Sequence, residues 1–224
     1  MPPRPAAAHA DIDESIRESP PGHYVLAAAI VDDDQADVLR HMLRSLIPRG
    51  AARFHWHEVP AANRLEMCHV LASTDLRHVV AVATPLDPKR QERVCLSATS
   101  WRLNDQGVYR LQLETRRQRD ANDRRFLLGE QRANRLPLAL QYEFGHPNQE
   151  PLLWVPDAVA GAIAAALAGG ETRYLEAFGR SVDVLHMRLY ATKRGERPLI
   201  GVAGAACQCT VRQSSPVLSS SRRR

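Results

Sequence analysis

The chain has 224 residues, 44% of them hydrophobic, which excludes an intrinsically disordered protein and predicts one sizeable core rather than two domains. Its formal net charge of +5 does not indicate a basic folded domain, because the segment from Lys193 to Arg224 alone holds seven Lys or Arg and one Glu. The remaining residues are therefore close to neutral, and the overall charge gives no reason to expect an anionic partner for the domain.

The sequence predicts a cytoplasmic protein without a membrane partner. Residues 1–8 form a leader rich in Pro and Ala that lacks the apolar run of a signal peptide, and we expect this leader to be disordered. The longest run of small apolar residues, Ala158 to Ala168, is too short and too rich in alanine to span a bilayer. The four cysteines follow no CxxC spacing, which fits reduced thiols. These cysteines are Cys68, Cys95, Cys207 and Cys209.

The first part of the chain is predicted to begin with two paired strands. Residues 9–15 and 24–31 are both typical of strands, and the Pro-Pro-Gly turn at 20–22 favours a hairpin between them. The second segment, YVLAAAIV, is continuously apolar, as expected of a strand covered on both faces. Asp32 to Asp34 offer N-cap oxygens for a helix that continues to Leu46. We then expect a strand at 53–59, a helix at 63–74, a strand at 78–84 and a helix at 91–103.

The second part continues this alternation. Residues 108–116 place Leu111 and Leu113 on one face and Glu114 on the other, which predicts a half-buried strand. A helix over 156–167 begins with a proline and ends before Gly169-Gly170. The other expected elements are helices at 122–132 and 173–178, an edge strand at 137–144 and a strand at 182–189.

This order of elements predicts a three-layer α/β domain over residues 9–192, with a mixed central sheet flanked by helices. Residues 193–224 are basic and rich in Ser and Arg, and we expect them to form a disordered tail. The sequence contains no GxGxxG, P-loop, GxSxG or HExxH motif. A nucleotide cofactor, serine-hydrolase chemistry and zinc-protease chemistry therefore lack support.

Acidic residues in the strands are the first candidates for chemistry, because two divalent ions held by three or four carboxylates can cut a phosphodiester. Asp13 shares a face of the first strand with Asp11 and is followed by Glu14. The alternative is that this segment is only a polar edge that leads into a loop. Glu114 lies on the polar face of its strand, where a cross-strand ion pair with a neighbouring arginine is the alternative.

Two further candidate acids begin helices. Asp157 lies in the first turn of a helix whose small residues, among them Ala158 and Gly161, would let it approach the sheet closely. Asp123 opens the helix at 122–132. Each could instead be only a first-turn charge that the helix dipole favours.

Four segments in a fixed order resemble a known family. They are DIDES near the start, FHWHEV in the first third, LETRRQRDANDRR after the midpoint and PLLWVPDAVAGAI late in the chain. The sequence resembles the domain-of-unknown-function family numbered 3800, which is grouped with the ribonuclease H-like fold, over about Ala10 to Leu189. It departs from the usual DESG pattern at Ile16. The resemblance implies catalytic carboxylates that hold Mg²⁺ or Mn²⁺. These would be Asp13, Glu114 and Asp157, with Asp123 as a fourth metal ligand.

An arginine-rich segment predicts contacts with nucleic acid. Between Arg110 and Arg135 there are eight Arg against four acids, and the segment brackets two of the candidate metal ligands. Because guanidinium groups match phosphate oxygens, we expect Arg116 and Arg124 to contact a phosphate backbone. The alternative is a solvated helix face.

Two histidines are candidates for substrate contact. His55 and His57 would alternate on the expected strand at 53–59, with Trp56 in the core on its other face. An HxH pair can bind a transition metal, but a polar strand face or substrate contact is favoured over a zinc site.

The sequence supports two classes of function. The leading hypothesis is a divalent-metal-dependent nuclease or related phosphodiester hydrolase of the ribonuclease H-like class. The alternative is a non-catalytic ribonuclease H-like module that binds nucleic acid or a protein partner. The hydrolase hypothesis requires that Asp13, Glu114 and Asp157 lie in one pocket rather than in separate ion pairs.

Overall fold

β1 (Ala8–Arg17) and β2 (His23–Asp32) pair as an antiparallel hairpin at the centre of the sheet, which confirms the predicted hairpin. The computed structural model describes residues 7–18, 22–47, 50–84, 88–178, 181–188 and 201–203. Every residue of β2 except its last is buried, as expected of a strand covered on both faces. β1 continues past Ile16 to its last paired residue, Arg17, so no loop follows Asp13 directly.

The hairpin is extended on both sides into a mixed sheet. The strand order is β5-β4-β1-β2-β3-β6-β7, with β1–β2–β3 antiparallel and β5, β4 and β1 mutually parallel. β1 is therefore an inner strand, and the interpretation of its acidic segment as a polar edge is wrong. The remaining strands are β3 (Arg77–Ala83), β4 (Arg110–Glu114), β5 (Gln141–Gly145), β6 (Val182–Arg188) and β7 (Gly201–Ala203).

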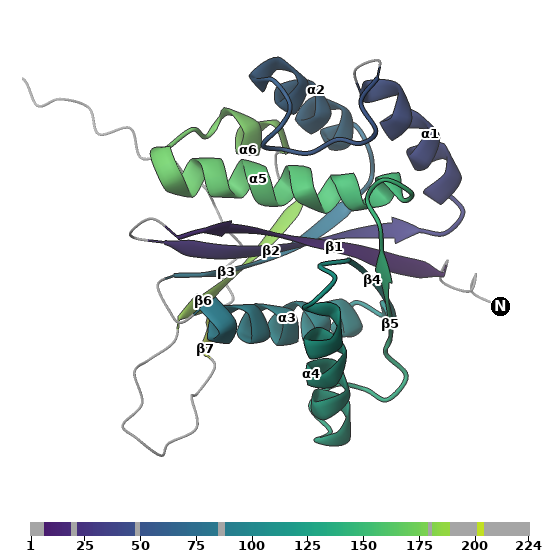
Figure 1. The fold of residues 1–224 in the computed structure, drawn as a ribbon, viewed down its shortest axis with the longest axis vertical. Helices are drawn as coiled ribbons and strands as arrows, with labels where there is room; N and C mark the ends of the chain where they lie inside the picture. The colour runs from purple at the N-terminus through teal and green to yellow at the C-terminus, as the bar shows by residue number, and fades with distance from the viewer. Residues whose placement is uncertain are drawn as a thin grey trace, which may run out of the picture.

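Helices cover both faces of the sheet and give the molecule three layers (Figure 1). One face carries α1 (Ala36–Leu46), α2 (Ala61–Ala72), α5 (Trp154–Gly169) and α6 (Arg173–Phe178), and the short η1 (Pro151–Leu153) packs against α1 and α5 there. The other face carries α3 (Pro88–Asp105) and α4 (Asp120–Arg132). A separate hydrophobic cluster fills the space on each side of the sheet. The predicted three-layer architecture with a mixed central sheet is confirmed.

α5 is the main helix of its layer and packs on β1 and β2. The segment Pro151–Gly169 is long and apolar enough to cross a membrane by length and composition alone. However, the first ten residues of α5 are all buried, so its composition is that of a core helix. Gly170, with a φ of 70°, forms the left-handed C-cap, as the predicted Gly-Gly stop requires.

The predicted strand at 53–59 is wrong, because these residues form a turn. The carbonyl oxygen of His55 accepts hydrogen bonds from the N–H groups of Glu58 and Val59. Phe54 and Trp56 are buried. The alternation of apolar residues that suggested a strand therefore comes from a turn that places two side chains in the core.

The predicted N-cap of the first helix is also wrong. The residue before α1 is Gln35, which makes no side-chain cap hydrogen bond. Asp33 instead forms ion pairs with His9, at 2.9 Å, and with Arg110. His9 of β1 and Arg110 of β4 thus bind the Asp33 carboxylate that was expected to cap the helix.

The ends of the folded part differ slightly from the prediction. β1 begins within the expected leader, at Ala8, and β7 (Gly201–Ala203) falls inside the expected tail at 193–224. A three-residue strand pairs through its backbone and leaves almost no side-chain pattern, which explains why it escaped prediction. The rest of the tail, with Cys207 and Cys209, and residues 1–6 lie outside the described residues.

Candidate carboxylate site

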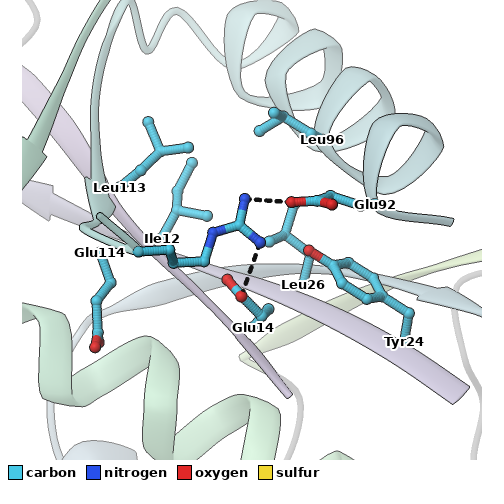
Figure 2. A pocket seen from close by; sticks show the side chains of 9 residues that line it. Ile12, Glu14, Tyr24, Leu26, Glu92, Leu96, Leu113 and Glu114 are labelled. Carbon is cyan, nitrogen blue, oxygen red and sulfur yellow. Dashed lines mark hydrogen bonds and ion pairs between the residues drawn. The ribbon is translucent and has the colours of Figure 1, made fainter. Parts of the chain in front are cut away.

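Asp13 and Glu114 project from adjacent parallel strands onto the same face of the sheet. β1 and β4 pair through Ile12 and Leu113, whose side chains enter the core beneath α3. Because side chains alternate across a strand, the next residues, Asp13 and Glu114, project to the opposite face, which α5 covers. Figure 2 shows the Glu114 carboxyl directed away from that of Glu14. The structure therefore brings these two candidate acids together.

Asp157 reaches this face from the first turn of α5. Its Oδ2 accepts a 2.8 Å hydrogen bond from the backbone N–H of Trp56 and lies 3.4 Å from Nδ1 of His55. Gly161, one turn further along, has no room for a side chain, because a Cβ there would lie 2.3 Å from the Trp56 indole. Gly161 thus leaves room for the Trp56 side chain, and the contact of this turn with α5 holds Asp157 in place.

The three carboxyls lie within electrostatic reach of one another. Burial raises the pKa of Asp13 well above its usual value, and the charges of Glu114, Glu14 and Asp157 raise it further. Burial also raises the pKa of Glu114 to about 7, and the charge of Asp157 adds to this rise. The site therefore concentrates negative charge in a partly buried place, where repulsion favours protonation or a bound cation.

Two side chains from the 53–59 turn offset part of this charge. Nη1 of Arg53 lies 3.8 Å from Oε1 of Glu114, and its Nη2 lies 3.9 Å from Glu58. Both distances exceed that of a hydrogen bond. The hydrogen bond to Asp157 raises the pKa of His55. The sequence pointed to His55 but not to Arg53, because no local pattern shows that this turn is anchored against α5.

Asp123 and Arg116 lie in a separate cluster on the other face of the sheet. Arg116 forms ion pairs with Glu14, at 2.8 Å, and with Glu92 and Asp123. Figure 2 shows the carboxyls of Glu14 and Glu92 on either side of one guanidinium, with a dashed line to each. Asp123 is thus not brought to Asp157, and the sheet separates the two. The guanidinium of Arg116 is already occupied by three carboxylates.

The other two expected substrate contacts, Arg124 and His57, are both exposed. The guanidinium carbon of Arg124 lies 5.1 Å from the ring centroid of Phe144 and 5.9 Å from that of Tyr142. The ring of His57 packs edge-on against that of His55, with centroids 5.9 Å apart. Arg124 is therefore at the surface of α4, and His57 lies beside the carboxylate site.

The ligands offered at the site suit a hard divalent cation. Oxygen ligands are those that Mg²⁺ and Mn²⁺ prefer, and Asp13, Glu114 and Asp157 supply them. Within the described residues, no three His, Cys, Asp or Glu side chains already surround one point. Mg²⁺ keeps several of its waters and needs only one or two direct carboxylate ligands. An acid cluster that is not closed around a point can therefore still hold such an ion.

Comparisons with known proteins give distant structural similarity alone. No protein-family model matches the chain, and no curated protein matches it significantly. The chain is similar to ribonuclease HII from Archaeoglobus fulgidus, solved in a complex with PCNA (15% identity, TM-score 0.44, 69% of this chain and 70% of that chain). It is also similar to ribonuclease H2 from Pyrococcus horikoshii (15% identity, TM-score 0.45, 73% of this chain and 78% of that chain). A third similar structure is Bst-RNase HIII in complex with Mn²⁺ (12% identity, TM-score 0.45, 75% of this chain and 65% of that chain).

The strand arrangement of the chain itself defines its fold class. An antiparallel meander of β1, β2 and β3 continues into the parallel strands β4 and β5, and helices cover both faces. The chain has the ribonuclease H-like α/β fold that was predicted.

Proposed function

We propose that this chain is a divalent-metal-dependent nuclease in which Asp13, Glu114 and Asp157 hold Mg²⁺ or Mn²⁺. The observation that carries the proposal is that these three acids, from β1, β4 and α5, project onto one face of the sheet, where the charges of Glu114 and Asp157 raise the pKa of Asp13. Asp13 forms no ion pair with a cationic side chain in the part of the chain that the structure describes. Internal ion pairing therefore does not explain Asp13, and a bound cation would relieve its repulsion with Glu114 and Asp157.

The proposed reaction is hydrolysis of a phosphodiester. Metal ions bound at the site would supply a water activated near neutral pH and would stabilise charge on the leaving oxygen. The N–H of Trp56 orients the Asp157 carboxylate. Arg53 makes only long contacts with acids, so its guanidinium can turn to a phosphate oxygen of the substrate.

We also propose that the chain belongs to the domain-of-unknown-function family numbered 3800. The support is that three of the segments that carry the resemblance contribute one acid each to the same site. These acids are Asp13 from DIDES, Glu114 from LETRR and Asp157 from PLLWVPDAV. The FHWHEV segment contributes the turn that anchors Asp157.

The nuclease proposal is tested with Asp13→Asn and Asp157→Asn. Single-stranded and duplex oligonucleotides, as RNA and as DNA, are incubated with each variant and with Mg²⁺ or Mn²⁺. Each substitution removes a ligand charge worth several kcal/mol in the transition state, so we expect a loss of about 100-fold or more in rate. Glu143→Gln changes an exposed acid on the neighbouring β5 and should leave the rate unchanged.

Metal binding is measured separately from activity. Millimolar Mn²⁺ should raise the melting temperature of the native chain and of Glu143→Gln, but not that of Asp13→Asn. An unchanged cleavage rate in Asp13→Asn or Asp157→Asn would reject the assignment. Tight binding of oligonucleotides without metal-dependent cleavage by the native chain would instead favour the non-catalytic module.

A further inference from the structure

A cavity of about 450 Å³ opens at the carboxyl ends of β4 and β5, where ligands commonly bind in open α/β sheets. Its volume is within the range of about 300–1,000 Å³ found for small-ligand pockets. Gly145, in the cavity wall, pairs with Glu114 across the two strands. The cavity therefore adjoins the carboxylate site.

The two acids of the cavity are already paired. The carboxylate of Glu150 forms hydrogen bonds of 2.8–3.1 Å with the guanidinium of Arg40. Asp120 accepts a 2.5 Å hydrogen bond from the hydroxyl of Thr115 and a 2.7 Å one from the N–H of Arg116. Among the described residues, no Lys or Arg side chain lines the cavity. With the two carboxylates Asp120 and Glu150 beside His146 in its wall, the cavity does not suit a phosphate, which requires positive charge.

Two glutamine amides in the cavity remain available for hydrogen bonding. Within the described residues, the side chains of Gln112 and Gln149 make no hydrogen bond. A Cβ at Gly145 would lie 2.6 Å from Nε2 of Gln112, so the glycine leaves the space that this amide occupies. A glutamine amide offers two donors and one acceptor, which matches the edge of a nucleobase.

We infer that this cavity binds one nucleobase of the strand that is cut at the carboxylate site. The inference rests on the proposed function. Gln112 and Gln149 would bond to the edge of the base. A base that is stacked and paired in a duplex cannot enter this cavity unless it is flipped out of the helix. The preferred substrate therefore has an unpaired nucleotide beside the cleaved phosphodiester.

The experiment moves a single abasic nucleotide along a single-stranded oligonucleotide and measures binding by fluorescence anisotropy. Asp13→Asn is used so that the oligonucleotides are not cut. We expect the affinity to fall about tenfold at one position of the missing base and to change little elsewhere. When the native chain cleaves the intact oligonucleotide, the nucleotide at this position should lie next to the cleaved phosphodiester.

Two added substitutions show whether the cavity is responsible. Gln112→Ala in the Asp13→Asn chain should remove the dependence on position. Gln141→Ala should keep it, because Gln141 is an exposed glutamine of β5 that does not line the cavity.

The possible results separate this inference from the proposed function. If affinity does not depend on the position of the missing base while the native chain still cleaves oligonucleotides, the base-binding cavity is rejected and the nuclease stands. If position dependence survives in Gln112→Ala, the cavity is likewise rejected. If the native chain neither binds nor cleaves any of the oligonucleotides, both ideas fail.

Discussion

The indole of Trp56 fills the space that a side chain at Gly161 would need, since a Cβ at Gly161 would lie 2.3 Å from the ring. The backbone N–H of the same tryptophan donates to Asp157, one helical turn earlier. One residue therefore joins the 53–59 turn to α5 through both its side chain and its backbone. Through this turn, Arg53 and His55 reach the carboxylate site.

Gly161→Ala should therefore disturb both stability and activity. The added methyl group must displace the buried Trp56 ring, and such overpacking costs about 1–3 kcal/mol. Urea denaturation measures this cost, and the cleavage rate should fall because Asp157 loses its N–H partner. Gly169→Ala is the matched control on the same helix, since nothing lies within 4 Å of its Cβ position. Equal stabilities of the two variants would show that Trp56 does not occupy this space.

The raised pKa of Glu114 predicts a pH-dependent effect on stability in the absence of divalent cations. The folded pKa of about 7 exceeds the usual value of 4.5, so between these pH values the folded chain keeps a proton that the unfolded chain has released. The stabilisation is complete below about pH 4.5 and is lost as the pH rises through 7. Glu114→Gln stays neutral, so at pH 8 it should be more stable than the native chain.

Melting curves from pH 4.5 to 8 in a chelator test this prediction. The advantage of Glu114→Gln over the native chain should grow with pH and shrink when Mn²⁺ is added, because the cation stabilises the ionised native site. Glu143→Gln, at an exposed position, should show no such growth. A difference between Glu114→Gln and the native chain that is constant over this range would contradict the proposed repulsion among the acids.

Arg116 is predicted to stabilise the fold rather than to bind substrate. Arg116→Met leaves Glu14, Glu92 and Asp123 without their shared cation, and breaking this partly buried ion-pair cluster costs up to about 3–5 kcal/mol. Arg117→Met, at the next and exposed position, should change the free energy of unfolding by less than about 0.5 kcal/mol. Urea denaturation at pH 7 compares the two. A small loss in Arg116→Met would mean that the cluster is solvated.

Much of the fold could be predicted because buried faces leave periodic patterns. The apolar run from Tyr24 to Val31 and the alternation at Leu111 and Leu113 predicted β2 and β4, whose faces are covered as expected. The turn at 53–59 could not be distinguished from a strand, because a turn that buries Phe54 and Trp56 shows the same alternation.

The site was predictable in part for a similar reason. Asp13 and Glu114 occupy defined faces of their strands, and their register places them side by side. Asp123 was expected with them, but α4 lies on the other face of the sheet, and a helix's own sequence does not say which face it covers. Arg53 had no signal at all, because its position depends on the contact between Trp56 and Gly161.

Substitution of Arg53 tests whether this residue binds a phosphate oxygen of the substrate. Because its nearest acid contacts are 3.8 and 3.9 Å long, its guanidinium is available for a phosphate oxygen. Arg53→Gln should lower kcat/KM about tenfold and reduce the slope of log kcat/KM against log salt by about 1. The shift in melting temperature with Mn²⁺ should persist, because Arg53 is not a metal ligand. Arg77→Gln, at an exposed arginine at the start of β3, should change neither quantity. An unchanged salt slope in Arg53→Gln would show that Arg53 does not contact the phosphate backbone.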